Sequence, residues 1–237
     1  MNLYELNQLA IQFRLDIGIN LNDPIDFFPV ITNKIKNLTI VFLDMPEDIS
    51  GACNIINSQK IMFINSYHSK GRQTFTAAHE IFHLFYEKPI FTICNVNSDD
   101  EIEKRANQFA SFLLLPTGAL YNYKKENNII KWDLNSIIDC EQYFQISHEA
   151  LLYRLMFHDE ITKDEFNSFK PKIKYHAIRR GYGLSLYEPY IDKNYTIGNY
   201  ARLVEKAFER DLISNGKREE YLLQSYLQDL VYNLEEL

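Results

Sequence analysis

The residues best suited to chemistry form the run His79-Glu80-Ile81-Phe82-His83, which has the pattern H-E-x-x-H. Two histidines four positions apart lie one turn above each other on a helix, so both imidazoles can bind one metal ion from a single face. Glu80 lies about 100° around the helix, where its carboxylate is placed to take a proton from a water molecule. The pattern therefore predicts a metal-dependent hydrolytic site.

A catalytic zinc site uses three protein ligands and keeps one position open, so a third ligand must come from another element. Helical periodicity over 100–115 predicts a second helix that carries Glu101 and Glu103. These residues lie about 200° apart around a helix, so only one of them can face the histidines. Ala106 and Ala110 mark the side on which two helices can approach closely, and Glu103 lies beside that side. We therefore predict Glu103 as the third ligand.

Asn107 follows Glu103 by four positions and lies one turn further along the same helix. From there its amide can orient a ligand histidine from outside the metal site. On spacing alone, an amide that faces solvent is an equally good interpretation.

The elements that must position these residues are a helix and a small sheet. Apolar residues recur at helical spacing over 71–87, which predicts the helix that carries the H-E-x-x-H run. Runs rich in β-branched and aromatic residues at 38–43, 52–56 and 60–64 predict three strands. Two short helices are expected within 1–33, so the sheet lies between helices in the sequence.

The composition is that of a folded, acidic protein. Of its 237 residues 46% are hydrophobic and 24% are charged, and the formal net charge is -7. This charge argues against an extended nucleic-acid surface, so we expect no direct nucleic-acid binding. No apolar run is long enough for a membrane span, and the start lacks the basic segment of a signal peptide, so we expect a cytoplasmic protein. Cys53, Cys94 and Cys140 form no C-x-x-C pair and are expected to be buried free thiols.

Two motifs together resemble the ImmA/IrrE family of metallopeptidases. The first is 72–83, which reads RQTFTAAHEIFH, and the second is 103–116, which reads EKRANQFASFLLLP. The second motif, E-x-x-A-N-x-F-A followed by L-L-x-P, is more specific than the first. Residues 61–65 are similar to the family's strand before the active-site helix, and 144–155 to the helical segment after the peptidase core.

The resemblance implies an α+β fold with a gluzincin-like peptidase core, in which a small β-sheet packs on the H-E-x-x-H helix, followed by a mainly helical C-terminal region. It implies a zinc ion (Zn2+), with manganese (Mn2+) as the alternative, held by His79, His83 and Glu103, and Glu80 as general base. The implied activity is that of a cytoplasmic endopeptidase. Its implied substrate is a helix-turn-helix transcriptional repressor of a mobile element, a phage or a stress response.

The resemblance and the local patterns divide the chain into three expected parts. These are a zinc metallopeptidase domain at 1–122, a helix-turn-helix-like helical segment at 123–168 and a mostly helical C-terminal region at 169–237. A mixed, tyrosine-rich stretch at 171–198 is the expected joint between the second and third parts.

Two other functions remain open. Residues 134–155 also match a helix-turn-helix, with a break at 145–147, so a DNA-binding regulator is one alternative, although Arg154 is the main basic residue of its second helix. The other alternative is a metal-stabilised regulator that binds a repressor without cutting it. In that case Glu80→Gln would leave the biological output unchanged.

A peptidase must also hold an extended substrate and stabilise an oxyanion. We expect the strands within 52–64 to offer a free sheet edge with which a substrate can pair. Tyr86, Tyr121, His148 and Tyr153 qualify as oxyanion donors by residue type only, and packing or capping is the more common role of such residues.

Overall fold

The fold is built around one mixed β-sheet. The computed structural model describes residues 1–87, 92–95 and 100–232. The sheet has the strand order β4-β2-β3-β1-β5, with β1 (Leu38–Leu43), β2 (Ile49–Ile56), β3 (Gln59–Asn65), β4 (Thr92–Asn95) and β5 (Tyr195–Gly198). β1 and β3 run parallel, and the other three strand pairs are antiparallel. The predicted α+β class is confirmed.

The three strands predicted from local patterns are present, and β4 and β5 extend the sheet on both sides. The predicted free edge within 52–64 is wrong over most of its length, because β3 pairs with both β1 and β2, and β4 pairs with β2 over 49–53. β5 was not predicted. It comes from the tyrosine-rich stretch 171–198 and pairs with β1, so the C-terminal region contributes a strand to the central sheet.

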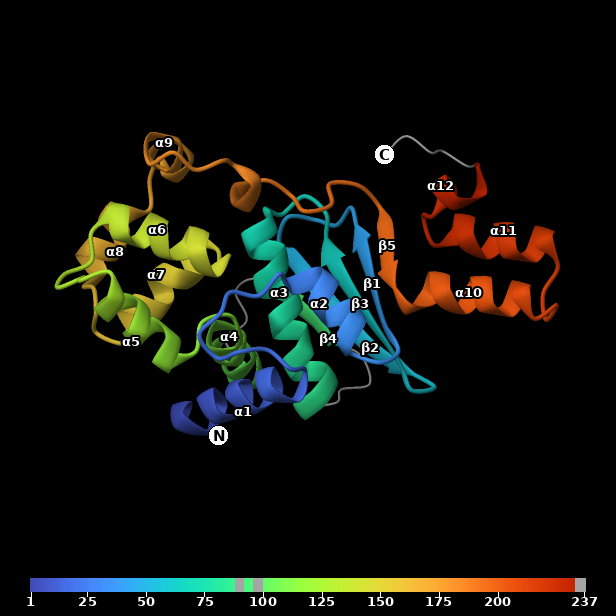
Figure 1. Ribbon diagram of the computed structural model, residues 1–237, viewed down its shortest axis with the longest axis horizontal. Helices are drawn as coiled ribbons and strands as arrows, with labels where there is room; N and C mark the ends of the chain where they lie inside the picture. Colours follow the sequence, from blue (N-terminus) through green and yellow to red (C-terminus); the bar gives the residue numbers. More distant parts are fainter. Residues whose placement is uncertain (88–91, 96–99, 233–237) are drawn as a thin grey trace.

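The described part of the N-terminal half contains four α-helices: α1 (Leu3–Asp16), α2 (Phe27–Lys34), α3 (Lys70–Phe82) and α4 (Glu101–Leu114). α3 packs on β2 and β3, α4 packs on α3, and α1 packs on α4 (Figure 1). Ala106 and Ala110 of α4 are fully buried, as expected for helices that approach closely. The H-E-x-x-H helix therefore lies between the sheet and α4.

The C-terminal half is mainly helical, as predicted. Its helices are α5 (Thr117–Glu126), α6 (Leu134–Phe144), α7 (His148–Phe157), α8 (Lys163–Phe169), α9 (Ile173–Arg179), α10 (Asn199–Glu209), α11 (Asn215–Gln224) and α12 (Gln228–Val231). Figure 1 shows α5 to α9 at one end of the molecule and α10 to α12 at the other, with the sheet between them. The segment that joins the two groups contains a short 3-10 helix, η2 (Ser185–Tyr187), and β5.

The main hydrophobic core runs from α1 through the sheet and α4 into α5 to α8, so it crosses the predicted boundary between 1–122 and 123–168. A separate small core, built on Val204, Leu222 and Leu227, lies within 169–237. The three-part division itself stays a prediction.

Cys53 and Cys140 are buried free thiols, as predicted, whereas the side chain of Cys94 lies outside the described residues. Among the helices described, none combines the length and the apolarity that crossing a bilayer requires.

Candidate metal site and cleft

Helix α3 holds its side chains in fixed positions because it is buried on almost every side. Of its 13 residues, all but Lys70, Arg72 and Phe75 are buried. Gln73 ties the helix to its surroundings, since its side-chain amide donates hydrogen bonds of 3.0–3.2 Å to main-chain oxygens at the end of β3 and at Ile191. At His83 the helix continues as a π-helix, η1 (His83–Glu87), a distortion that is frequent at functional sites.

His79, His83 and Glu103 converge on one point. The two imidazole Nε2 atoms are 3.0 Å apart, and Glu103 Oε2 and Oε1 lie 3.1 Å from His79 Nε2 and 3.3 Å from His83 Nε2. All three side chains are buried. In the part of the chain that the structure describes, no other group of three or more His, Cys, Asp or Glu residues is arranged to hold a metal ion.

The donor set fits a divalent cation such as zinc. Ligand atoms around a tetrahedral zinc at about 2.0–2.2 Å lie about 3.3–3.6 Å from one another, and the three donor pairs here are 3.0, 3.1 and 3.3 Å apart. Two imidazole nitrogens and one carboxylate are the ligand set of several catalytic zinc sites. Two facing nitrogen lone pairs beside a carboxylate are therefore arranged as a chelate rather than as an ordinary core contact.

Asn107 orients one of the imidazoles. Its Oδ1 lies 2.9 Å from His79 Nδ1. A side-chain amide oxygen only accepts hydrogen bonds, so Nδ1 of His79 carries a proton and donates it. In the neutral imidazole the lone pair is then on Nε2, the atom that faces His83 and Glu103.

The protonation of the site follows from burial and from the close contacts. Burial alone would raise the pKa of Glu103, but hydrogen bonds and charge from His79 and His83 outweigh it and hold that pKa far below its usual range. Burial would lower the pKa of His79, but its hydrogen bond to Glu103 and the charges of Glu80 and Glu103 raise it instead. Without a metal ion, Glu103 is thus a carboxylate that keeps a proton on His79.

Glu80 lies outside this cluster and faces strand β2. Its side chain is fully buried and bonds to the thiol of Cys53. Burial and the neighbouring Glu80 carboxylate raise the pKa of that thiol, so Cys53 stays protonated and donates to Glu80. A Cβ added at Gly51 would lie 3.1 Å from Glu80 Oε1 and 2.6 Å from Thr76 Cγ2. β2 thus forms the wall against which the carboxylate is held.

We expect Gly51→Ala to destabilise the protein, because the added methyl group would crowd the contact between β2 and α3. The new methyl would also lie 2.8 Å from the main-chain oxygen of Phe63, which cannot move without shifting β3. Overpacking of this kind destabilises a protein by about 1–3 kcal/mol. The matched control is Gly118→Ala in α5, where nothing lies within 4 Å, so we expect a change within about 1 kcal/mol and in the stabilising direction. Urea unfolding of both variants checks this, and equal stabilities for the two would contradict it.

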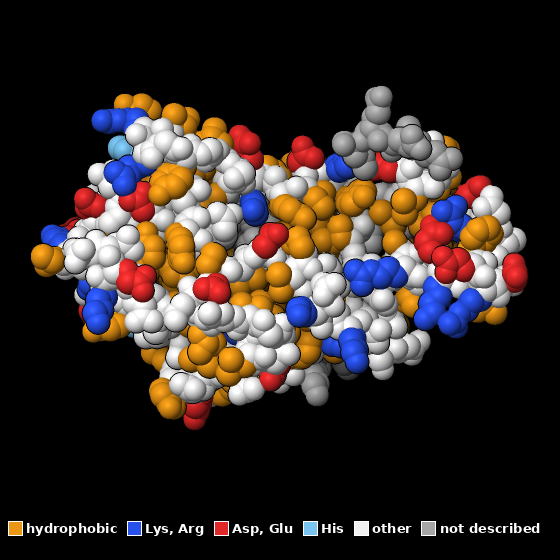
Figure 2. Space-filling model, viewed as in Figure 1, with side chains coloured by type: hydrophobic (Ala, Val, Ile, Leu, Met, Phe, Trp, Pro, Cys, Tyr) orange, Lys and Arg blue, Asp and Glu red, His pale blue; other side chains and the backbone are white. Residues whose placement is uncertain are grey.

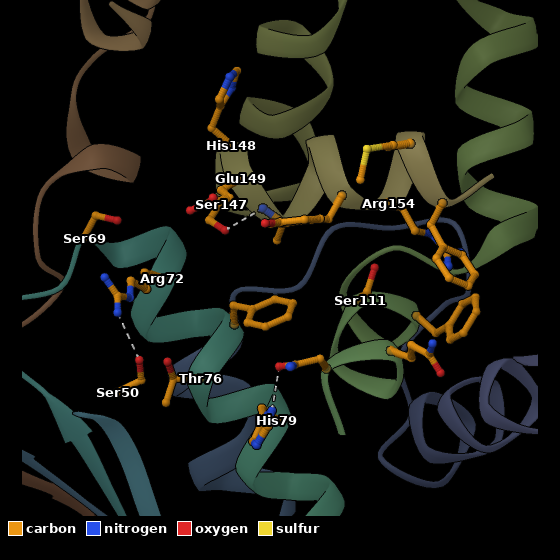
Figure 3. Close-up of a pocket in the computed structure, with 18 of the residues that line it drawn as sticks. Ser50, Ser69, Arg72, Thr76, His79, Ser111, Ser147, His148, Glu149 and Arg154 are labelled. Atoms are coloured by element: carbon orange, nitrogen blue, oxygen red, sulfur yellow. Dashed lines mark hydrogen bonds between the residues drawn. The ribbon is translucent and has the colours of Figure 1, made fainter. Parts of the chain in front are cut away.

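A cleft of about 640 Å³ opens beside His79. Figure 3 shows its walls: Arg72, Thr76 and His79 along α3, Ser111 on α4, and Ser147 and Glu149 at the start of α7. Phe75, Phe112, Tyr153, Met156 and Phe157 add apolar surface. The local sequence pattern did not reveal this cleft, because α7 is brought opposite α3 only by the tertiary fold.

The four residues considered as oxyanion donors occupy different environments. Tyr86 packs on the rings of Phe82 and Phe109, and Tyr121 is exposed. The ring of His148 lies between Glu141 and the main-chain oxygen of Phe169. Tyr153 borders the cleft and packs on Phe166. The geometry assigns none of these four residues to the oxyanion.

The helix-turn-helix pattern forms a hairpin of α6 and α7, with Gln145 in the left-handed conformation between them. Ser147 caps α7, since its hydroxyl accepts from the main-chain nitrogen of Ala150. Arg154, the main basic residue of α7, is buried, stacks 4.0 Å from the centre of the Phe112 ring and donates to Thr117. It is therefore not exposed to a DNA phosphate.

Among protein families, one family model matches more than half of the chain. The family model Peptidase_M78, described as the IrrE N-terminal-like domain, matches residues 33–156. None of the curated proteins matches the sequence. A solved Mycobacterium tuberculosis transcriptional regulator is 14% identical, with a TM-score of 0.46, over 65% of this chain and 46% of its own. This chain thus spans less than half of that protein. A similarity this weak gives no information about function.

Proposed function

Because the chain belongs to the Peptidase_M78 family of IrrE N-terminal-like domains, we propose that it is a zinc-dependent endopeptidase that cleaves a helix-turn-helix transcriptional repressor. The observation that carries this proposal is the convergence of His79, His83 and Glu103 at the edge of a cleft, with a buried glutamate next to them in sequence. A structural metal site would instead be closed by four protein ligands.

His79, His83 and Glu103 would hold the ion in this mechanism. A bound zinc ion would polarise the scissile carbonyl group and make a water molecule acidic enough to be deprotonated near neutral pH. Asn107 keeps the Nε2 lone pair of His79 directed at the ion. The proposed ligands lie on α3, η1 and α4, which pack against one another, so each of the three side chains is held by a helix.

Glu80 is the proposed general base. Its carboxylate accepts the proton of the attacking water and later delivers it to the leaving amine, which makes one residue serve both steps. The hydrogen bond from Cys53 and the close approach of Gly51 fix the carboxylate against β2. Fixing the base before the substrate binds avoids an ordering cost during the reaction.

The proposed substrate segment is extended and enters the cleft between α3 and α7. β3 has neighbours on both sides and β4 pairs with β2 over 49–53, so main-chain pairing along most of these two strands is not available to a substrate. The cleft walls, which carry both apolar and charged side chains, provide the contacts instead. An exposed linker of a repressor can adopt this conformation, whereas a folded helix cannot.

DNA binding finds less support than proteolysis. Arg154 is buried beneath the surface of α7, and the formal net charge of the chain is -7. On the face shown in Figure 2, Lys and Arg side chains are interspersed with Asp and Glu and form no continuous basic track. A regulator that binds a repressor without cutting it would use the same surface as a peptidase. The Glu80→Gln variant discussed below separates these two functions.

The test is to incubate the purified, zinc-loaded chain with the helix-turn-helix repressors encoded beside its gene. We expect one of them to yield a defined fragment pair, with the cut in an extended linker and with no cut in the presence of a chelator. Mass spectrometry of the fragments gives the cleavage site. Intact repressors after prolonged incubation with the zinc-loaded protein would argue against the proposal, as would cleavage that persists after the metal is removed.

Zinc binding should strengthen as the pH rises. The raised pKa of His79 means that a proton must leave before the ion binds. In the metal-free protein, protonated His79 stabilises the fold through its contact with Glu103. This stabilisation is fully present below the ordinary histidine pKa of 6.5 and is lost as the pH rises through the raised pKa of His79. The Glu103 contribution is complete above 4.5 and is lost as pH falls through the lowered value. Over the pH range in which Glu103 is ionised and His79 is protonated, the ion pair between them therefore competes with metal binding.

We accordingly expect the increase in melting temperature caused by zinc to be small at about pH 5 and much larger at about pH 8. Thermal melts with and without zinc across this range measure it. A zinc-induced shift of equal size at both ends would contradict the protonation scheme.

A further inference from the structure

Arg72 lies on the same face of α3 as His79 and borders the cleft (Figure 3). The two residues are seven positions apart, which is two helical turns or about 10 Å along the helix axis. Thr76 lies between them on the same cleft wall. A substrate that passes His79 in an extended conformation advances about 3.3 Å per residue, so it reaches Arg72 after about three residues.

The positive charge of Arg72 is not balanced by a close carboxylate. Its side chain is half-buried, and among the described residues it donates one hydrogen bond, to the hydroxyl of Ser50 at 3.2 Å. Within the described ranges no Asp or Glu oxygen lies within 4.0 Å of its guanidinium. Glu149 faces it across the cleft but forms an ion pair with Lys170 at 2.8 Å. Burial lowers the pKa of Arg72 and outweighs the carboxylates of Glu149 and Glu47, which act on the guanidinium only from a greater distance. A half-buried charge without a carboxylate in direct contact suits a site that a ligand completes.

The rest of the cleft has the same charge bias. Its described lining contains three basic residues, Arg72, Lys104 and Arg154, and one acidic residue, Glu149, although the formal net charge of the whole chain is -7. His68, which lies beside Arg72, is neutral near pH 7, because burial and the charge of Arg72 lower its pKa to about 4. Arg72 therefore supplies the permanent positive charge at this end of the cleft.

We propose that Arg72 determines specificity by binding a carboxylate of the substrate about three residues from the scissile bond. The planar guanidinium matches a carboxylate in two parallel hydrogen bonds, and the half-buried position strengthens them. This inference rests on the proposed peptidase function, which it deepens by stating what the substrate must carry. The carboxylate is an Asp or Glu side chain or the C-terminus of the substrate chain, and the experiment distinguishes the two.

The experiment uses the full-length, zinc-loaded protein and a proteome-derived peptide library, in one form with free and in another with amidated C-termini. The variants are Arg72→Gln and Arg72→Glu. The matched control is Lys70→Gln, which removes one positive charge from the same turn of α3, at a residue that bonds to Gln145 and does not line the cleft. Mass spectrometry of the cleaved peptides gives the residue preference at each position around the cut. Zinc content and melting temperature show that each variant is folded and loaded.

For the wild type and Lys70→Gln we expect Asp and Glu to be enriched at one position two to four residues from the cut. We expect cleavage of such peptides to fall about tenfold or more in Arg72→Gln, the size of one charge-assisted hydrogen bond. Arg72→Glu should prefer Lys and Arg at that position. Enrichment in both library forms assigns a side-chain carboxylate, and enrichment confined to the free-acid form assigns the C-terminus. Cleavage without acidic enrichment, or with enrichment unchanged in both variants, would overturn the proposal while the peptidase function stands.

If the wild type cleaves no peptide, the peptidase proposal fails and the role of Arg72 is still decided by binding. Immobilised zinc-loaded Glu80→Gln protein, with and without Arg72→Gln, captures peptides from the same library. Retention of acidic peptides that depends on Arg72 supports a carboxylate site. Retention of the same peptides by both proteins, or by neither, overturns it.

Discussion

Glu80→Gln is expected to abolish proteolysis while the protein keeps its zinc. The amide has the shape of the carboxylate but cannot accept the proton of the attacking water, and loss of a general base lowers turnover by about one hundred- to ten thousand-fold. Glu80 is not one of the three clustered ligands, so metal content and the melting temperature of the zinc-loaded protein should change little. Cleavage rates and metal analysis on the same sample measure both quantities.

This variant also separates a peptidase from a regulator that only binds a repressor. In cells that carry the repressor and a reporter gene, a peptidase variant without its base leaves the repressor intact and the reporter off. A regulator that acts by binding releases the reporter equally well with Glu80→Gln. Full reporter output from the variant would therefore contradict the catalytic account, even if metal binding were normal.

Glu103→Gln should remove the metal itself. The amide replaces a charged oxygen donor that lies 3.1 and 3.3 Å from the two imidazoles, so the site loses one of its three ligands and its negative charge. We expect zinc content to fall from about one ion per chain to near zero after dialysis, with cleavage lost and the melting temperature no longer raised by zinc.

The matched control is Glu101→Gln, two residues earlier on the same helix. Glu101 is 81% exposed and forms a surface ion pair with Lys104 at 3.5 Å, which contributes little. Zinc content and activity of this variant should equal those of the wild type. If Glu101→Gln lost the metal and Glu103→Gln retained it, the assignment of the third ligand would be wrong.

The grouping of His79, His83 and Glu103 was largely predictable, because the information that fixes it is local in the sequence. The spacing of His79 and His83 fixes both imidazoles on one helical face, and the choice of Glu103 over Glu101 needs only the helical rotation and the position of two alanines. The structure brings the three predicted residues together and places Glu101 at the surface. For Asn107 spacing left two interpretations. The structure shows that this residue is exposed and that its side chain also accepts a hydrogen bond from His79.

Other features depend on contacts between distant segments and could not be predicted in this way. β5 is only four residues long, and its partner β1 lies far away in the sequence, so neither strand carries a local sign of the pairing. The expected free edge was wrong for the same reason, since the neighbours of β2 and β3 are set by the whole sheet order. The position of Arg72 on a cleft wall becomes visible only when α7 is placed across the cleft.

The measurement that tests the account most directly is the anomalous scattering of crystals grown with zinc, recorded on both sides of the zinc absorption edge. The account predicts one strong peak per chain, about 2.0–2.2 Å from His79 Nε2, His83 Nε2 and a carboxylate oxygen of Glu103, with one coordination position facing the cleft. A peak at another place, or a fourth protein ligand that closes the position toward the cleft, would contradict a catalytic metal at this site.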